Sequence, residues 1–212
     1  MTDIYIIGAS GLAKEIATYI LDGKINSITA FVDKEIKNNH SILIRGKNYP
    51  VIDENDFFTT IDLMKVQPNV VIAIGYPKTR KQVSDKYISC CNFPNIIHPS
   101  VYCLSMPKIG MGNIVAPNVL LSVDIKIGNF NLINYGTTVG HDSIIGDYNV
   151  ILPQNIISGN VMIGSQNLFG AGTSVIENIT VGNENVIGMG SVSIHSMRDG
   201  DTFVGVPARS IK

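Results

Sequence analysis

Residues 127–146 read IGNFNLINYGTTVGHDSIIG, and a large apolar residue returns at every sixth position of this stretch. The residue that follows it is usually glycine or another small residue. The same phase continues in both directions without a break. In steps of six, the apolar positions are Ile109, Val115, Leu121, Ile127, Ile133, Val139, Ile145, Ile151, Ile157, Ile163, Phe169, Val175, Val181 and Ile187.

A period of six fits neither an amphipathic helix, whose period is about 3.6, nor a half-buried strand, whose period is two. It fits a solenoid with a triangular coil, in which each hexad supplies one short strand and one turn. We expect the apolar residue to point into the prism, and glycine or asparagine to occupy turn conformations that a β-carbon resists. Three hexads would complete a coil, and about five coils would stack at the ~4.8 Å spacing of hydrogen-bonded strands. The repeat therefore predicts a parallel β-helix over residues 96–212.

Residues 1–95 follow a different pattern, in which strands alternate with helices. IYIIGASGLAKEIATYI (residues 4–20) reads as a strand, a glycine turn and a helix, and ITAFVDK (residues 28–34) as a second strand that ends in an acid. PNVVIAIGYPKTRKQVSDKYIS (residues 68–89) repeats strand, glycine and helix. This alternation predicts a small, Rossmann-like α/β domain with three or four parallel strands. The strand ends that should meet at its ligand-binding carboxyl edge are Gly8, Asp33 and Gly75.

Charge and cysteine usage restrict the class of protein. The net charge is −1, which argues against a surface for nucleic acid or anionic membrane, because both require a basic excess. The three cysteines lack metal-ligand spacing and are typical of reduced thiols. The N-terminus MTDIYIIGASG lacks the basic segment of a signal peptide, and no apolar run is long enough to insert into a membrane. We therefore expect a soluble cytoplasmic protein.

His141 is the histidine with the strongest functional signal. It lies in the middle of the repeats, at a turn position that should face outward, and Asp142 follows it. An outward imidazole has no role in the core of a solenoid. Because a histidine ordinarily titrates close to neutral pH, it can accept a proton during a reaction. No Ser or Cys forms a nucleophile motif with a base, which favours direct transfer over an acyl-enzyme.

The loop after the first strand, Gly8-Ala-Ser-Gly-Leu-Ala13, resembles a dinucleotide fingerprint without its second glycine. Two interpretations fit it: a tight turn without a ligand, and a diphosphate site at the N-terminus of a helix, where free N–H groups favour anions. A domain of this size suits one nucleotide diphosphate better than a whole dinucleotide. Asp33 fits two roles as well, a solvated turn residue or an acceptor for ribose or base hydrogen bonds.

Together these motifs resemble a family. The GASG loop, VD after the second strand, AIG after a later strand, IIHPSV, IN ahead of GHDSIIGD, and the terminal FVGVPAR are similar to the trimeric bacterial sugar acyltransferases. That family includes sialic-acid O-acetyltransferases and the N-acetyltransferases of nucleotide-linked bacillosamine and perosamine. The resemblance implies a left-handed β-helix and an acetyl-CoA-dependent enzyme that forms a homotrimer. It also implies a nucleotide-linked amino sugar as acceptor, such as a 4-amino-4,6-dideoxyhexose used in lipopolysaccharide or other surface glycans.

The resemblance also implies roles for individual residues. His141 would be the general base, Asp142 would orient it, and Asn134 would lie near the acceptor amine. Acetyl-CoA would lie in the groove between two β-helices, and the residues implied there are Gly159, Ala171, Met189 and Gly190. The nucleotide end of the acceptor would occupy the N-terminal domain, where the implied residues are Ser10, Gly11, Leu12, Asp33, Lys34 and, from the strand end, Gly75. No metal is implied.

The sequence departs from the family pattern at one informative position. Many members carry a second histidine nine residues after the first, near the thioester, and here that residue is Val150. Three other functions are open: O-acetylation of a sialic-acid-type sugar, a non-catalytic scaffold or nucleotide sensor, and a metalloenzyme on the same prism. The metalloenzyme would need three converging histidines, whereas the prism centre offers one.

Overall fold

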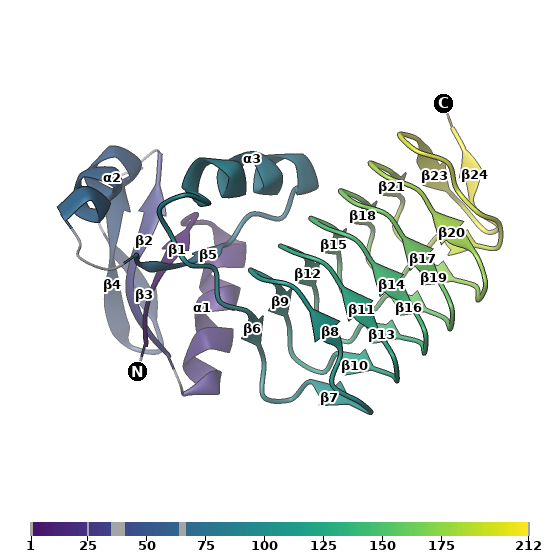
Figure 1. Cartoon of the computed structure of the whole chain (residues 1–212), viewed down its shortest axis with the longest axis horizontal. Coiled ribbons are helices and arrows are strands. Elements are labelled where there is room, and N and C mark those ends of the chain that lie inside the picture. Colours follow the sequence, from purple (N-terminus) through teal and green to yellow (C-terminus); the bar gives the residue numbers. More distant parts are fainter. Residues whose placement is uncertain (1, 25, 35–40, 64–66, 212) are drawn as a thin grey trace.

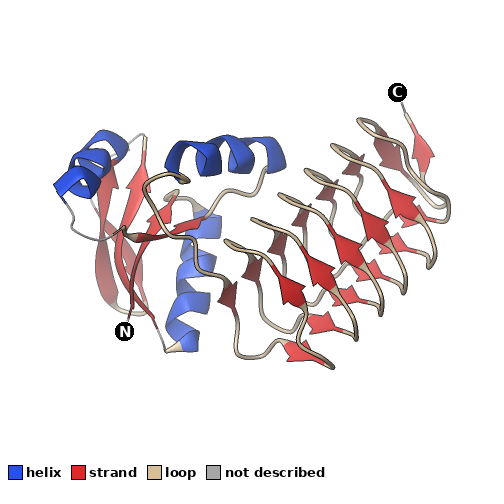
Figure 2. Cartoon of the chain, viewed as in Figure 1, coloured by secondary structure: helices blue, strands red, loops and turns tan. Residues whose placement is uncertain are grey.

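The computed structural model describes residues 2–24, 26–34, 41–63 and 67–211. The chain begins with a five-stranded sheet in the order β3-β4-β2-β1-β5. Its strands are β1 (Thr2–Ile7), β2 (Asn26–Asp33), β3 (Ser41–Ile44), β4 (Lys47–Asp53) and β5 (Asn69–Ile72). Its helices are α1 (Gly11–Gly23), α2 (Glu54–Leu63) and α3 (Pro77–Tyr87). Apolar residues of α1 pack on one side of the sheet, and those of α2 and α3 pack on the other (Figure 2).

The sheet is larger than the sequence predicts, because β3 and β4 form an antiparallel hairpin at its edge. The two residues between them, Arg45 and Gly46, have φ values of 50° and 79°. Positive φ at both positions is the geometry of a type I′ turn, which matches the twist of paired strands. The remaining pairings in this sheet are parallel, as the alternation of strands and helices predicts. The hairpin and α2 therefore add to the predicted α/β domain without changing its class.

From Ile96 onward the chain is a left-handed parallel β-helix with three faces (Figure 1). The six-stranded face contains β7 (Tyr102–Cys103), β10 (Leu120–Leu121), β13 (Thr138–Val139), β16 (Ile156–Ile157), β19 (Ser174–Val175) and β22 (Val192–Ser193). The five-stranded face contains β8 (Lys108–Ile109), β11 (Lys126–Ile127), β14 (Ile144–Ile145), β17 (Met162–Ile163) and β20 (Thr180–Val181). The eight-stranded face contains β6 (Ile96–Ile97), β9 (Ile114–Val115), β12 (Leu132–Ile133), β15 (Val150–Ile151), β18 (Leu168–Phe169), β21 (Val186–Ile187), β23 (Thr202–Val204) and the antiparallel β24 (Arg209–Ser210).

The core of the prism follows the repeat, but the glycines directly after the apolar residues have a different function from the one predicted. The repeating apolar residues from Val115 to Ile187 form one buried cluster. The glycines that follow them do not adopt positive φ; a Cβ on Gly140, for example, would lie 2.4 Å from the backbone of Ser158 in the next coil. Positive φ falls two residues later, at turn positions. Some of these carry the predicted glycine or asparagine (Gly112, Gly136, Gly172, Gly190, Asn118, Asn160 and Asn178), and the others carry side chains such as Asp142 and Gln154. Close approach of neighbouring coils, and not turn geometry, therefore requires the glycines directly after the apolar residues.

One column of asparagines is buried in the prism, whereas Asn118, Asn160 and Asn178 lie at its turns with positive φ. Asn131 accepts hydrogen bonds from the backbone N–H and the side-chain amide of Asn149, one coil further on. The same pair of bonds links Asn113 to Asn131 and Asn149 to Asn167. Each bond spans 18 residues, so one ladder of amides fixes the length of a coil. A buried polar side chain must be hydrogen-bonded to be tolerated, and the ladder meets that requirement.

The N-terminal sheet and the prism share a core. The outward residues of the first strands of the eight-stranded face are buried in the same cluster as α1, and Figure 1 shows α1 between the sheet and the first coils. These residues are Ile96, Ile114, Leu132 and Val150. The division into domains 1–95 and 96–212 stays a prediction, although β6 starts at Ile96.

Arg80 of α3 ties the two parts together through a fully buried guanidinium. It donates to the carbonyls of Ile72 (2.6 Å) and Ile74 (3.2 Å) in the N-terminal part. It also donates to the carbonyls of Phe130 (2.6 Å) and Gly112 (3.4 Å) in two neighbouring coils. Burial lowers the pKa of Arg80 to about 9, so the side chain is still a cation at neutral pH. The end of β5 is therefore held in a fixed position relative to the prism.

Candidate active site

A cavity of about 450 Å³ lies at the carboxyl ends of β1, β2 and β5. Five of the six residues that the sequence places at the acceptor line it: Ser10, Leu12, Asp33, Lys34 and Gly75. The sixth, Gly11, is the first residue of α1, beside the cavity. The strand ends therefore meet at one edge of the sheet, as the order of strands and helices predicts.

The loop after β1 is shaped by Gly8 and Asp33. Gly8 has a φ of 106°, and a Cβ on it would lie 3.0 Å from the carbonyl oxygen of Ala73, so only glycine fits without strain. The backbone N–H of Ala9 donates to Oδ2 of Asp33 at 2.9 Å, which joins the loop to the end of β2. Ser10 is the N-cap of α1, and its side chain makes no capping hydrogen bond. The first N–H groups of α1 are therefore available to an anion in the cavity.

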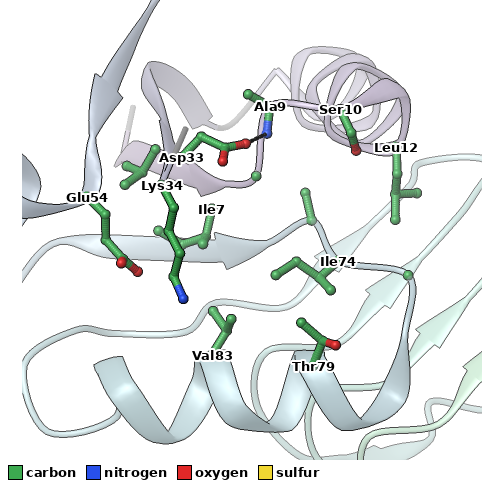
Figure 3. A pocket seen from close by; sticks show the side chains of 14 residues that line it. Ile7, Ala9, Ser10, Leu12, Asp33, Lys34, Glu54, Ile74, Thr79 and Val83 are labelled. Atoms are coloured by element: carbon green, nitrogen blue, oxygen red, sulfur yellow. Dashed lines mark hydrogen bonds between the residues drawn. The ribbon is translucent and has the colours of Figure 1, made fainter. Parts of the chain in front are cut away.

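The cavity wall contains two polar residues that the sequence pattern does not reveal. Glu54, at the start of α2, and Thr79, in α3, both line it, together with Ile74 and Val83 (Figure 3). Glu54 directly follows Asp53, the last residue of β4, and this position after a strand is the feature of the sequence that could have placed it at the cavity. That signal depends on recognising β4, which is part of the hairpin that the sequence pattern does not indicate.

His141 lies at the turn between β13 and β14, which we call the histidine corner (residues 123–124, 141–142, 159–160 and 177–178). Its side chain is 62% exposed, and its Nδ1 lies 2.8 Å from Oδ2 of Asp142. Asp142 adopts a φ of 59°, a left-handed conformation that Asp tolerates better than most residues. When the Nδ1–H donates to this carboxylate, Nε2 keeps a lone pair that faces away from it. This arrangement of imidazole and carboxylate suits a general base.

Gly159 lies directly against the imidazole. A Cβ on Gly159 would be 2.5 Å from Nε2 and 2.6 Å from Cε1 of His141. The ring therefore rests on the backbone of the next coil, at a position where any side chain would collide with it. The structure thus brings together the predicted base and one of the predicted acetyl-CoA residues.

The other predicted residues lie at a different turn, between the eight-stranded and six-stranded faces. We call it the asparagine corner (residues 117–118, 134–136, 153–154, 171–172 and 189–190). The side-chain oxygen of Asn134 accepts the N–H of Tyr135 at 2.8 Å, and the N–H of Gly190 donates to the carbonyl of Ala171 at 2.9 Å. Met189 is 76% exposed there. One chain therefore does not bring Asn134, Ala171, Met189 and Gly190 together with His141, because the six-stranded face separates the two corners.

Val150, which stands where many family members have a second histidine, is fully buried in the core shared by the two parts of the chain. It is the outward residue of β15 on the eight-stranded face, not a corner residue. A histidine at this position would be buried under α1, and the structure gives it no access to the histidine corner.

Two further properties bear on the class of protein. In the described residues there is no cluster of three or more His, Cys, Asp or Glu side chains that could hold a metal ion. Of α1, α2 and α3, the helices in the described part of the chain, none has the length and apolar character of a membrane-spanning helix.

Comparison with known proteins relates both parts of the chain to sugar acetyltransferases. Residues 3–87 match the family model of the PglD N-terminal domain. A search of curated protein sequences gives no match.

Solved structures match over the whole chain. A histidine-to-asparagine mutant of perosamine N-acetyltransferase from Caulobacter crescentus, in complex with CoA and GDP-perosamine, has a TM-score of 0.90 at 25% identity; the match covers 100% of this chain and 98% of that one. WeeI from Acinetobacter baumannii AYE has a TM-score of 0.88 at 28% identity, with 100% of both chains covered. The acetyltransferase domain of PglB from Neisseria gonorrhoeae FA1090 has a TM-score of 0.84 at 24% identity, again with both chains fully covered, and supports the fold.

Proposed function

This chain belongs to the bacterial family of hexapeptide-repeat sugar acetyltransferases, and from that premise we propose that it transfers the acetyl group of acetyl-CoA to the amine of a nucleotide-linked amino sugar. The acceptor class we propose is a 4-amino-4,6-dideoxyhexose made in the cytoplasm for lipopolysaccharide or another surface glycan. One observation carries the proposal: the chain joins a cavity of nucleotide size to a prism with an exposed His141–Asp142 pair. The solved perosamine N-acetyltransferase, bound to CoA and GDP-perosamine, supports both ligand classes.

The cavity suits the nucleotide end of such an acceptor. The N–H groups at the start of α1 can bind the diphosphate, because the partial positive charge of a helix N-terminus favours anions. Asp33, at the end of β2, lies where an acidic residue commonly accepts ribose hydroxyls in folds of this kind, and Lys34 directly after it can donate to an oxygen of the ligand. The sugar then extends out of the cavity toward the prism.

His141 supplies the proton transfer in this proposal. The acceptor amine attacks the thioester carbonyl and a C–N bond forms while its proton passes to Nε2. The C–S bond then breaks, and the CoA thiolate takes that proton from the imidazolium and leaves as the thiol. Asp142 holds the ring and favours the imidazolium that forms. Asn134 is proposed to contact the acceptor amine. Gly159, Ala171, Met189 and Gly190 are proposed to contact acetyl-CoA.

The division of these residues between two corners supports a site formed by two copies of the chain. Asn134 and His141 are about one hexad apart along the chain, so up to roughly 20 Å of extended backbone lies between the corners. The histidine corner of one copy facing the asparagine corner of the next would join the two sets. Such a head-to-tail contact closes into a ring, and we propose a ring of three.

The six-stranded face between the two corners carries the apolar surface that this assembly needs. Exposed apolar residues lie on its strands or directly after them: Tyr102, Leu104, Ile156, Ile176 and Ile194. Exposed apolar side chains on one face, here at its first coil and again from β16 onward, are typical of an interface between subunits.

We expect sedimentation velocity to give a trimer at micromolar concentration. Ile156→Arg should dissociate it and abolish transfer, because the charge would be buried in the interface. Met162→Arg, an equally exposed position on the five-stranded face, is the matched control and should leave a trimer. A fully active wild-type monomer would contradict the proposed assembly.

Asp33→Ala should raise the KM for the acceptor by about tenfold, the effect of losing one good hydrogen bond to a charged group. The KM for acetyl-CoA should stay unchanged, since the cavity holds the nucleotide alone. Asp56→Ala, on the exposed side of α2, is the control and should change neither value. Weaker acetyl-CoA binding in Asp33→Ala would show that the two ligands are assigned to the wrong parts of the chain.

The function itself is tested by release of free CoA thiol with nucleotide-linked 4-amino-4,6-dideoxy sugars as acceptors. We expect turnover with the amino sugars and none with the matched 4-hydroxy sugars, because the amine is the nucleophile. Turnover with free sialic acid and not with the amino sugars would establish a sugar O-acetyltransferase instead.

A further inference from the structure

Glu54 is a buried acid at one end of the cavity that the proposed transfer reaction does not use. It is 8% exposed and lies at the first position of α2. Figure 3 shows Ser10 and Leu12 at the opposite end of the cavity, with Asp33 and Lys34 between the two ends. The polar groups are therefore spread along the length of the cavity.

The carboxylate of Glu54 is held in its charged form. It accepts hydrogen bonds from the Tyr87 hydroxyl (2.7 Å) and from Nζ of Lys86 (2.6 Å). Burial alone would raise the pKa of Glu54, but the bonds from Lys86 and Tyr87 outweigh it and the pKa is lowered. An ionised carboxylate can accept about four hydrogen bonds and donate none. Two of these positions are filled by the protein, so the group can still accept from a ligand.

The order of the polar groups along the cavity assigns one part of the bound nucleotide to each end of the cavity. This step rests on the proposed function. A diphosphate at the start of α1 puts the ribose near Asp33, at the end of β2. The base then lies further along, at the Glu54 end. The apolar side chain of Val83 also lines the cavity and can pack against one face of a flat ring.

We propose that Glu54 reads the base and that the base is guanine. The edge of guanine presents two neighbouring donors, the N1–H and the 2-amino group, and both can donate to one carboxylate. Uracil and thymine present a single N–H between two carbonyls, and a carbonyl facing a buried carboxylate loses hydrogen bonding and is repelled. Adenine presents one donor beside an acceptor nitrogen. Guanine alone satisfies an acceptor-only group with two donors on one edge.

The test is isothermal titration of the full-length chain with GDP, IDP, UDP and dTDP. Inosine lacks only the 2-amino group of guanine, so IDP isolates one of the two proposed bonds. We expect GDP to bind about tenfold more tightly than IDP and more tightly still than UDP or dTDP, as good contacts to base edges provide. In Glu54→Gln the gap between GDP and IDP should close, because the amide offers one acceptor in place of two. Asp56→Asn, on the same helix, should keep it.

Each outcome decides a different point. Equal affinity for GDP and IDP in the wild type, or tighter binding of UDP or dTDP, would overturn the guanine assignment and leave the nucleotide cavity intact. No binding of any of the four nucleotides would overturn the proposed nucleotide cavity itself. If Glu54→Gln does not fold, Tyr87→Phe is measured in its place. This variant keeps the carboxylate and should keep the preference for GDP over IDP. Loss of that preference in a folded Tyr87→Phe would count against recognition of the base by Glu54.

Discussion

Replacing His141 with Asn lowers kcat by about 10²–10⁴-fold, the usual contribution of a general base. The KM values for both substrates change little, because the imidazole acts mainly in the transition state. The protein stays folded, since the side chain is 62% exposed and contributes nothing to the prism core. Steady-state kinetics, with circular dichroism and sedimentation on the same sample, measure all three.

Asp142→Asn is the companion variant, because it removes the charge beside Nδ1 and keeps the size of the side chain. It should reduce kcat less than His141→Asn does, since the base itself is retained. His98→Asn controls for the loss of an imidazole elsewhere in the chain: His98 pairs with Asp22 and Ser100, away from the histidine corner. A folded His141→Asn trimer that keeps more than about a tenth of the wild-type kcat would rule out the general base, and placement of a neutral amine beside the thioester would then carry the catalysis.

Gly159→Ala should reduce kcat by about 10²-fold, although it adds a single methyl group. A Cβ at this position would lie 2.5 Å from Nε2 of His141, so the imidazole must move away from its place on the backbone. Displacing a general base by about 1 Å can be as damaging to a reaction as removing a contact. Steady-state kinetics of Gly159→Ala and of the wild type measure this change in kcat.

Two further variants show whether the lower kcat of Gly159→Ala comes from displacement of His141. Gly23→Ala, where a Cβ meets no atom within 4 Å, controls for glycine replacement in general and should be neutral. The kcat of the double variant Gly159→Ala/His141→Asn should be no lower than that of His141→Asn alone, because the alanine lowers kcat through the histidine, whereas its proposed contact with acetyl-CoA affects the KM for that substrate. Additive losses in the double variant would mean that Gly159 acts through another contact.

The prism could be predicted from the sequence because its signal is repeated in every hexad. One apolar residue in six is enough to fix the inward face, and the phase holds from Ile109 to Ile187. The glycines were also visible, but their physical role was not: the clash at Gly140 involves Ser158, in the next coil. Contacts between coils depend on how far apart the backbones lie, and a pattern along one chain does not contain that distance.

The N-terminal part was predicted where strand, glycine and helix follow one another, and missed where they do not. The hairpin formed by β3 and β4 depends on a two-residue turn, Arg45-Gly46, in a stretch with several polar residues. Without β4, the position of Glu54 at a strand end is not evident. The cavity was therefore predicted at the α1 end and not at the Glu54 end.

The catalytic set shows a different limit. The sequence places His141 and Asp142 side by side, and the structure confirms the contact between them. That Gly159 supports the ring follows from the 18-residue coil, which brings residues 141 and 159 to the same corner. The distance between this corner and the corner that contains Asn134 is set by the width of the six-stranded face, which the sequence pattern does not give. Their roles in one reaction stay a prediction that depends on how copies of the chain assemble.

The most direct test of the central claim is the mass of the nucleotide sugar after incubation with the protein and acetyl-CoA. The substrate to use is a GDP-linked 4-amino-4,6-dideoxyhexose, with the UDP- and dTDP-linked forms in parallel. We predict that a nucleotide-linked sugar gains the mass of one acetyl group, located on the amine by fragmentation, in step with the release of CoA thiol. Thiol release with no acetylated nucleotide sugar, or an acetyl group found only on a hydroxyl, would contradict the account.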